Sequence, residues 1–270
     1  MRAESPTVVG RATRGSGATG RSLSRPGVVK GSMKTIRRAV LVVGVAAALG
    51  AHAQDLNIGQ GYSNMASGLM QTSMLNMAIR NAGEPHGAAA KASVRTDALT
   101  YTESPAVTAR VRKNFVAFLR GQGLNEGATS MEAYLAKADF RKDWAASAAP
   151  DGLKRGNALD ALTEYWVTNW AIANGKTSTT PAQARGLKAQ MAPLMAGNPT
   201  FRKLGNAGRQ ELAEVWMINT IAQGGGYMAA VRQGDKAMIQ KASDAAVTRF
   251  KNETKIDLRA VKLTDRGFVR

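Results

Sequence analysis

"LTEYWVTNW" at residues 162–170 and "LAEVWMINT" at residues 212–220 share the pattern Leu-x-Glu-x-Trp-x-x-Asn, fifty residues apart. An α-helix turns about 100° per residue, so the Leu, Trp and Asn of each copy lie on one face of a helix. Each such face needs a neighbouring helix to bury it. The pair predicts helices over about 157–174 and 206–223 and indicates a small internal duplication.

Start signals for further helices occur from residue 104 onward. Ser104 and Thr180 each stand directly before a proline, which puts a capping residue ahead of a proline at the first helical position. Thr129 and Glu132 have the Thr-x-x-Glu spacing of a capping box, which predicts a short helix through Phe140. These signals indicate that helices follow one another closely.

Glycines in the sequence predict where some of these helices end. The glycines at 224–226 predict the end of the helix that holds the second copy. A final helix is expected over 227–254, with an interruption near Gly234, and the tail after it is expected to be irregular or extended. No stretch has the pattern of two strands joined by a turn. We therefore expect an all-α fold, a single bundle of about six or seven helices with a pseudo-repeated helix and an irregular C-terminal tail.

The first hundred residues divide into three segments. Residues 1–32 are rich in Gly, Ser and Arg without an apolar face, so we expect a disordered extension upstream of the true start at Met33. Residues 33–53 have a basic start, an apolar run too short to span a bilayer, and a small-x-small ending at Ala53, as in a secretory signal peptide. A helix and a linker over 54–100 would then precede the domain at 101–270. The expected mature protein is periplasmic or secreted, without a transmembrane anchor.

Charge and cysteine content narrow the classes of partner and chemistry. The formal net charge is +18, and about +10 remains once the basic residues 1–53 are set aside. A positive surface favours an anionic envelope component or an acidic protein as partner. The basic residues are dispersed and the aromatic residues lie on apolar faces, so we expect no nucleic acid. The chain has no cysteine, which excludes disulfides, thiol catalysis and cysteine-based zinc sites, and we expect no cofactor.

The repeated pattern places one asparagine in the middle of each apolar face. A buried amide needs hydrogen-bond partners, because leaving it unpaired costs about 1–3 kcal/mol. Asn169 and Asn219 would therefore bond to each other, to helix backbone or to water, and set the register of paired helices. Alternatively they line a ligand pocket floored by Trp166 and Trp216. We favour the first interpretation, because Trp at helical spacing usually belongs to a core.

Two other sets of residues are candidates for chemistry. Glu164 is expected to point toward solvent, whereas Glu214 is expected to be partly buried with a raised pKa, which makes it the candidate acid of a hydrolase. The methionines Met70, Met74 and Met77 follow helical spacing and are candidate ligands for a soft metal such as Cu(I). An adaptable packing face is the simpler interpretation of these methionines.

Five blocks occur in order between residues 101 and 268. They are "YTESPAVTARVRKNFV" at 101–116, "ALDALTEYWVTNWAIANG" at 158–175, "TPAQARGLKAQ" at 180–190, "ELAEVW" at 211–216 and "LTDRGF" at 263–268. Through them the chain from Tyr101 to Phe268 resembles a family of uncharacterised exported bacterial proteins whose domain has no known function. The resemblance implies a helical secreted domain, supplies no reaction or ligand, and leaves residues 54–100 uncovered.

Taken together, these features lead us to expect an exported, soluble helical module that binds or interacts in the cell envelope, rather than an enzyme. Two alternatives stay open. One is a hydrolase of an envelope polymer that uses an acidic residue, and the other is soft-metal binding through the N-terminal methionine face.

Overall fold

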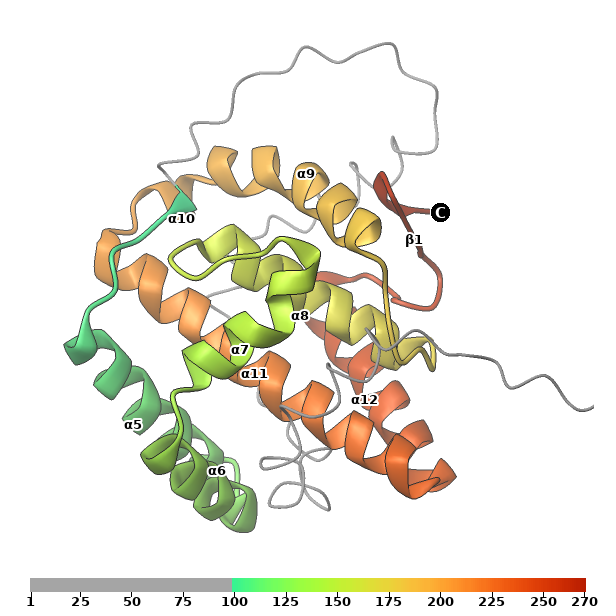
Figure 1. Ribbon diagram of the computed structural model, residues 1–270, viewed down its shortest axis with the longest axis horizontal. Coiled ribbons are helices and arrows are strands. Elements are labelled where there is room, and N and C mark those ends of the chain that lie inside the picture. Colours follow the sequence, from blue (N-terminus) through green and yellow to red (C-terminus); the bar gives the residue numbers. More distant parts are fainter. Residues whose placement is uncertain (1–98) are drawn as a thin grey trace, which may run out of the picture. The chain divides into compact units, whose positions relative to one another are not determined.

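The computed structural model describes residues 99–270 (Figure 1). The expected extension at 1–32, the signal peptide at 33–53, and the helix and linker up to residue 98 lie outside the described residues. So do the candidate metal ligands Met70, Met74 and Met77. No helix in the described part of the chain is long and apolar enough to cross a membrane.

The all-α fold is confirmed, with eight α-helices between residues 99 and 270. They are α5 (Pro105–Gly121), α6 (Asn125–Lys137), α7 (Phe140–Ala148), α8 (Ala158–Ala173), α9 (Pro181–Gly197), α10 (Pro199–Arg202), α11 (Asn206–Gln233) and α12 (Lys236–Thr254). A 3₁₀ turn (Ala149–Asp151) follows α7. The tail is more regular than expected, because β1 (Lys262–Thr264) and β2 (Gly267–Val269) form an antiparallel hairpin.

Three of the predicted helix starts are confirmed and one is wrong. Helix α5 begins at Pro105, directly after Ser104, although the Ser104 side chain makes no capping hydrogen bond. The side chain of Asn157 accepts hydrogen bonds from the backbone at the start of α8, and Thr180 forms a complete capping box with Gln183 at the start of α9. Thr129 instead lies inside α6, where its hydroxyl donates to the carbonyl oxygen of Asn125 at 3.0 Å. A threonine can bond back to the preceding turn of a helix as well as cap a new one, so the spacing alone was ambiguous.

The predicted helix stop at residues 224–226 is also wrong, because α11 continues through these glycines to Gln233. Gly224 lies against α8, and a methyl group at this position would be 3.3 Å from Cγ2 of Thr168. A glycine inside a helix costs roughly 1 kcal/mol, and the packing of a long central helix can exceed that cost. The expected break at Gly234 is confirmed, since Gly234 is left-handed and Asp235 caps α12.

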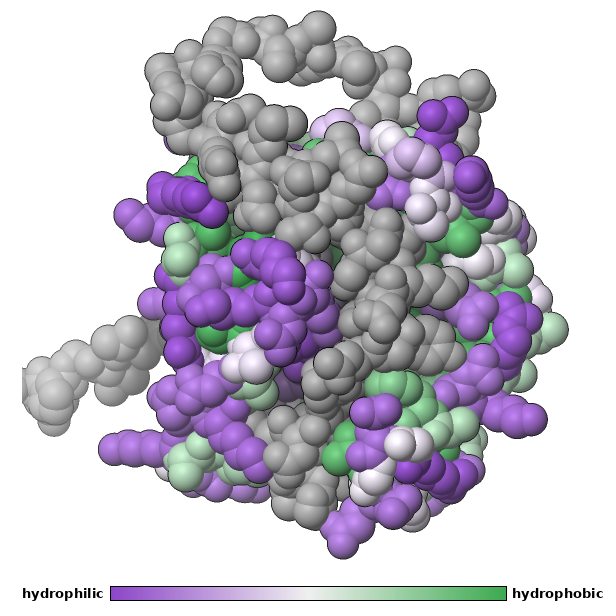
Figure 2. All heavy atoms as spheres, turned by 180° about the vertical axis from the view of Figure 1, so that it is seen from behind, coloured by the Kyte–Doolittle hydropathy of each residue, from purple (hydrophilic) through white to green (hydrophobic). Residues whose placement is uncertain are grey.

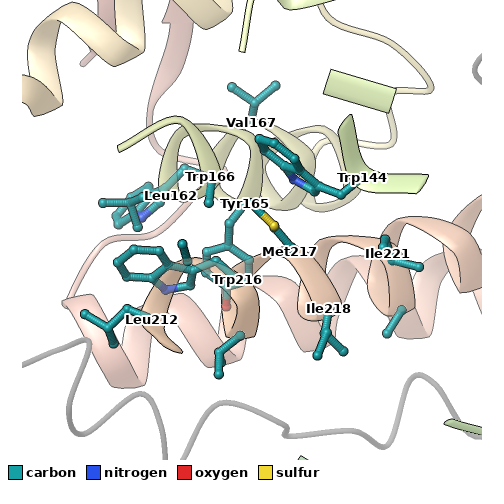
Figure 3. Packing of buried hydrophobic residues seen from close by; sticks show 14 of the residues in the cluster. Trp144, Leu162, Tyr165, Trp166, Val167, Leu212, Trp216, Met217, Ile218 and Ile221 are labelled. Carbon is teal, nitrogen blue, oxygen red and sulfur yellow. The ribbon is translucent and has the colours of Figure 1, made fainter. Parts of the chain in front are cut away.

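Helices α8 and α11 form the centre of the fold (Figures 1 and 3). Helices α5 and α7 pack on α11, α9 packs on α8, and α12 packs on both. Trp166 lies edge-on to Phe250 of α12, with ring centroids 4.7 Å apart, and 5.8 Å from Phe268 of the hairpin. Trp166 of the first copy therefore joins α8 to the C-terminal elements.

The hairpin is attached to α9 through its backbone. Gln190 acts as both donor and acceptor to Phe268, at 2.9 and 2.8 Å, and Gln183 donates to the carbonyl oxygen of Leu263 at 2.8 Å. Gly186 lets the hairpin turn approach the helix directly. Two glutamines and a glycine on α9 thus replace the neighbouring strand that a short hairpin lacks.

Candidate functional site

The two asparagines of the repeated pattern are both buried and have equivalent contacts. The side-chain nitrogen of Asn169 donates to the carbonyl oxygen of Tyr165 at 2.8 Å, and that of Asn219 donates to Val215 at 2.9 Å. The oxygen of Asn219 accepts from Gln223 at 3.4 Å. The two amides do not bond to each other, but each bonds to the backbone of its own helix.

Arg249 of α12 connects the two copies. Its guanidinium donates to the side-chain oxygen of Asn169 and, at 3.1 Å, to that of Gln223. The Arg249 residue is only 6% exposed. Burial raises the pKa of the neighbouring Tyr165 phenol to about 12, an effect that the positive charge of Arg249 opposes. These hydrogen bonds satisfy both asparagines without a ligand, which supports the packing interpretation of the repeated pattern.

Sequence reasoning missed Arg249, although a signal was present. Arg249 follows Ala242 by seven residues, which is two helical turns, and it neighbours Phe250 in a run whose other inward positions are small or apolar. A charged residue on the apolar face of a helix predicts a buried polar partner. The partners themselves, on α8 and α11, could not be predicted from α12 alone.

Glu164 and Glu214, the acids of the two copies, are both buried. The prediction that Glu164 points toward solvent is wrong, since this residue is 4% exposed. Helices α9, α11 and α12 surround α8, so little of its circumference is left to water. The predicted burial of Glu214 is confirmed and is more complete than expected, because no part of its side chain is exposed.

Glu214 lies beneath a layer of charged side chains at the junction of α5, α7 and α11. Its Oε1 accepts hydrogen bonds from Thr108 at 2.8 Å and Gln210 at 2.9 Å, and Arg141 lies 3.9 Å away. Burial raises the pKa of the Glu214 carboxyl above its usual value, and these donors only partly offset the effect. Above it, Glu103 pairs with Arg141. A substrate would have to pass this layer to reach Glu214. The role of Glu214 as the acid of a hydrolase stays a prediction.

We expect the Glu214→Gln variant to melt a few degrees higher than the parent protein at pH 8 and at the same temperature at pH 4. The folded-state pKa of Glu214 is raised, so ionising the carboxyl as pH rises costs the folded state stability, whereas below about pH 4.5 both states are protonated. Glutamine keeps an acceptor for Thr108 and Gln210. Thermal melts at both pH values test this, and a variant less stable at pH 8 would show that the ionised carboxylate stabilises the fold.

A cavity of about 340 Å³ lies between α7, α8 and α11, and we name it the α7–α8–α11 cavity. Its walls are mainly apolar and aromatic and include Trp144, Val167, Ile172, Ile221, Tyr227 and Val231. The loop after α8, residues 176–179, forms part of its rim with a lysine and three hydroxyl side chains. Asp143 and Glu164 also line it. Apolar walls with a few polar groups at this volume are typical of sites for small organic molecules.

None of Trp166, Asn169, Trp216 and Asn219 lines this cavity, and neither does Glu214. Sequence reasoning therefore identified buried residues of the core, but the cavity is built from other parts of the same helices. Among residues 99–270, no group of three or more His, Cys, Asp or Glu side chains is placed to hold a metal ion. The described geometry is thus that of a mainly apolar cavity with an acidic side.

The described surface opposite the view of Figure 1 is mostly hydrophilic, with smaller apolar areas between (Figure 2). Among the exposed basic side chains of the described residues, some are paired, as in the Arg259–Asp244 and Lys251–Asp257 bridges at 2.6 and 3.1 Å. Exposed pairs of this kind contribute little to stability and mainly keep a surface solvated. The α7–α8–α11 cavity is therefore a more specific candidate site than this described surface.

Comparison with known proteins adds a family but no function. Neither a curated protein nor a solved structure matches the chain. One family model matches residues 34–270, a span that extends further toward the N-terminus than the resemblance over Tyr101 to Phe268. The chain therefore belongs to DUF6683, a family of unknown function.

Proposed function

We propose that this chain is a ligand-binding helical domain whose α7–α8–α11 cavity takes a small molecule or side chain with an apolar body. The single observation that carries the proposal is the cavity itself, about 340 Å³ with mainly apolar walls. A protein interior is normally packed with few voids larger than a water molecule, so a cavity of this size loses contacts that a ligand can restore. If the signal-like segment at 33–53 directs export, this binding takes place in the cell envelope or outside the cell.

The walls and the rim of the cavity suit different parts of a ligand. Trp144 from α7 and Ile221 from α11 supply flat and branched apolar surface, whereas Thr177 and Ser178 at the rim supply hydroxyl groups. Burial of apolar area gives most of the affinity in such a site, and the polar groups fix orientation. A ligand with an aromatic or branched body and one polar end meets both requirements.

Phenethyl alcohol is a suitable first probe of this proposal, because it has an aromatic body and one hydroxyl. A ligand of this size is expected to bind with a dissociation constant of about 2 mM, given roughly 0.4 kcal/mol per heavy atom. Titration of isotope-labelled protein, followed by the chemical shifts of residues around the cavity, measures this constant. Saturable shifts confined to α7, α8 and α11 are expected.

A larger side chain inside the cavity should weaken binding of the probe. Ala171 is half-buried and lines the cavity, so the Ala171→Phe variant should occupy part of it and weaken binding at least tenfold. The matched control is Ala237→Phe, at an exposed position of α12 that is not part of the lining. Equal affinities for both variants and the parent protein, or no saturable binding at all, would refute the proposal.

A further inference from the structure

The acidic side of the α7–α8–α11 cavity contains a carboxylate that is held in place. Asp143 lines the cavity, and one of its oxygens, Oδ2, accepts a hydrogen bond from the Tyr134 phenol at 2.7 Å. Burial, together with this bond, raises the pKa of Tyr134 well above its usual value, so the phenol keeps its proton and continues to donate. No hydrogen bond or ion pair among the described residues engages the other oxygen, Oδ1. Asp143 is thus oriented by Tyr134 while half of its acceptor capacity stays available.

Aromatic side chains line the same cavity as this carboxylate. Tyr134, Trp144 and Tyr227 all line the same cavity, each from a different helix. The face of an aromatic ring attracts a cation, and the attraction is larger where water is excluded. A second carboxyl group, that of Glu164, lines the cavity as well. Carboxylates combined with aromatic faces are the chemistry that proteins use to recognise an ammonium group.

Among the described residues that line the cavity, Lys176 at the rim is the one basic residue, and its positive charge disfavours an ammonium group. It lies on the exposed loop after α8, where water and salt screen its charge and its flexible side chain can turn outward. Asp143 is half-buried, so its interaction with a ligand in the cavity is screened less. The cavity is therefore locally acidic in a chain with a formal net charge of +18.

We infer that the α7–α8–α11 cavity selects ligands that carry a cationic amine next to an apolar body, with Asp143 as the residue that receives the amine. This inference rests on the proposed function, since it names the class of ligand for the same cavity. The apolar body would occupy the walls at Trp144 and Ile221, and the ammonium group would donate to Oδ1 of Asp143.

The test compares phenethylamine with phenethyl alcohol, which has the same size and shape but no charge at neutral pH. We expect the amine to bind about tenfold more tightly than the alcohol, because a charge-assisted hydrogen bond is roughly twice as strong as a neutral one. The Asp143→Asn variant should lose most of this preference for the amine. A thermal melt that matches that of the parent protein shows that the variant is folded.

Two further variants show whether the preference for the amine depends on charges at the cavity or on the charge of the whole protein. Asp265→Asn, at an exposed position in the hairpin turn outside the cavity, should keep the full preference for the amine. Lys176→Gln should increase that preference. Equal binding of both probes by the parent protein would overturn the inference and leave the proposed function standing, whereas no binding of either probe would refute both. A preference that survives in Asp143→Asn would also overturn the role of Asp143.

Discussion

The Gly186→Ala variant is expected to lose about 3 kcal/mol or more of unfolding free energy, a loss comparable to the larger overpacking effects in protein cores. A methyl group at Gly186 would lie 2.2 Å from the carbonyl oxygen of Asp265 and 2.7 Å from the backbone nitrogen of Gly267. These are backbone atoms of the hairpin turn, so no side chain can rotate away. Intrinsic helix propensity favours alanine over glycine by roughly 1 kcal/mol and so predicts the opposite sign.

Chemical denaturation of Gly186→Ala and Gly197→Ala measures this effect against a matched control. Gly197 ends the same helix, and a methyl group there would meet no atom within 4 Å. The control variant should be neutral or slightly more stable. For a chain of this size, the loss at Gly186 corresponds to a melting temperature lower by about 6–12 °C. A stable Gly186→Ala variant would show that the hairpin does not pack directly on α9.

The Arg249→Met variant is expected to lose about 2–5 kcal/mol, because two buried acceptors lose their donor. Arg249 donates to the side-chain oxygens of Asn169 and Gln223, which face it from α8 and α11. A buried acceptor left unpaired costs about 1–3 kcal/mol, and methionine has no group to replace the guanidinium. Equilibrium denaturation measures the loss, and Arg232→Met at the exposed end of α11 is a suitable control.

A double-mutant cycle shows whether the stability lost in Arg249→Met comes from the hydrogen bond between Arg249 and Asn169. Once Asn169→Leu has removed one acceptor, the additional cost of Arg249→Met should fall by about 1–3 kcal/mol. Additive effects of the two substitutions would show that the arginine does not stabilise the paired helices through Asn169. In that case the packing interpretation of the repeated pattern would lose its main support.

The sequence predicted those parts of the fold that depend on local signals. Helices α8 and α9 have the expected bounds to within a few residues, because Asn157 and Thr180 cap them through their own neighbours. The end of α11 was missed, because three consecutive glycines resemble a stop unless the close approach of Thr168 is known. Glu164 was missed because helical spacing gives the direction of a side chain but not what covers it.

The candidate site was harder to predict than the fold, since no single segment contains it. Tyr134, Asp143 and Tyr227 come from three helices and meet only when the chain is folded. Each of these residues is ordinary in its own segment. The Trp and Asn of the repeated pattern were correctly predicted to be buried, but none of them lines the cavity. Of the four, Asn169 accepts a hydrogen bond from Arg249.

The most direct test of the proposed function is the position of a bound probe. Intermolecular nuclear Overhauser effects between the ring protons of phenethyl alcohol and the protein's methyl groups report contacts within about 5 Å, a distance at which apolar side chains touch a ligand. We expect such effects at Ile172, Ile221 and Val231, which line the α7–α8–α11 cavity. Bound probe whose contacts fall only on methyl groups elsewhere in the protein would contradict the assignment of this cavity as the binding site.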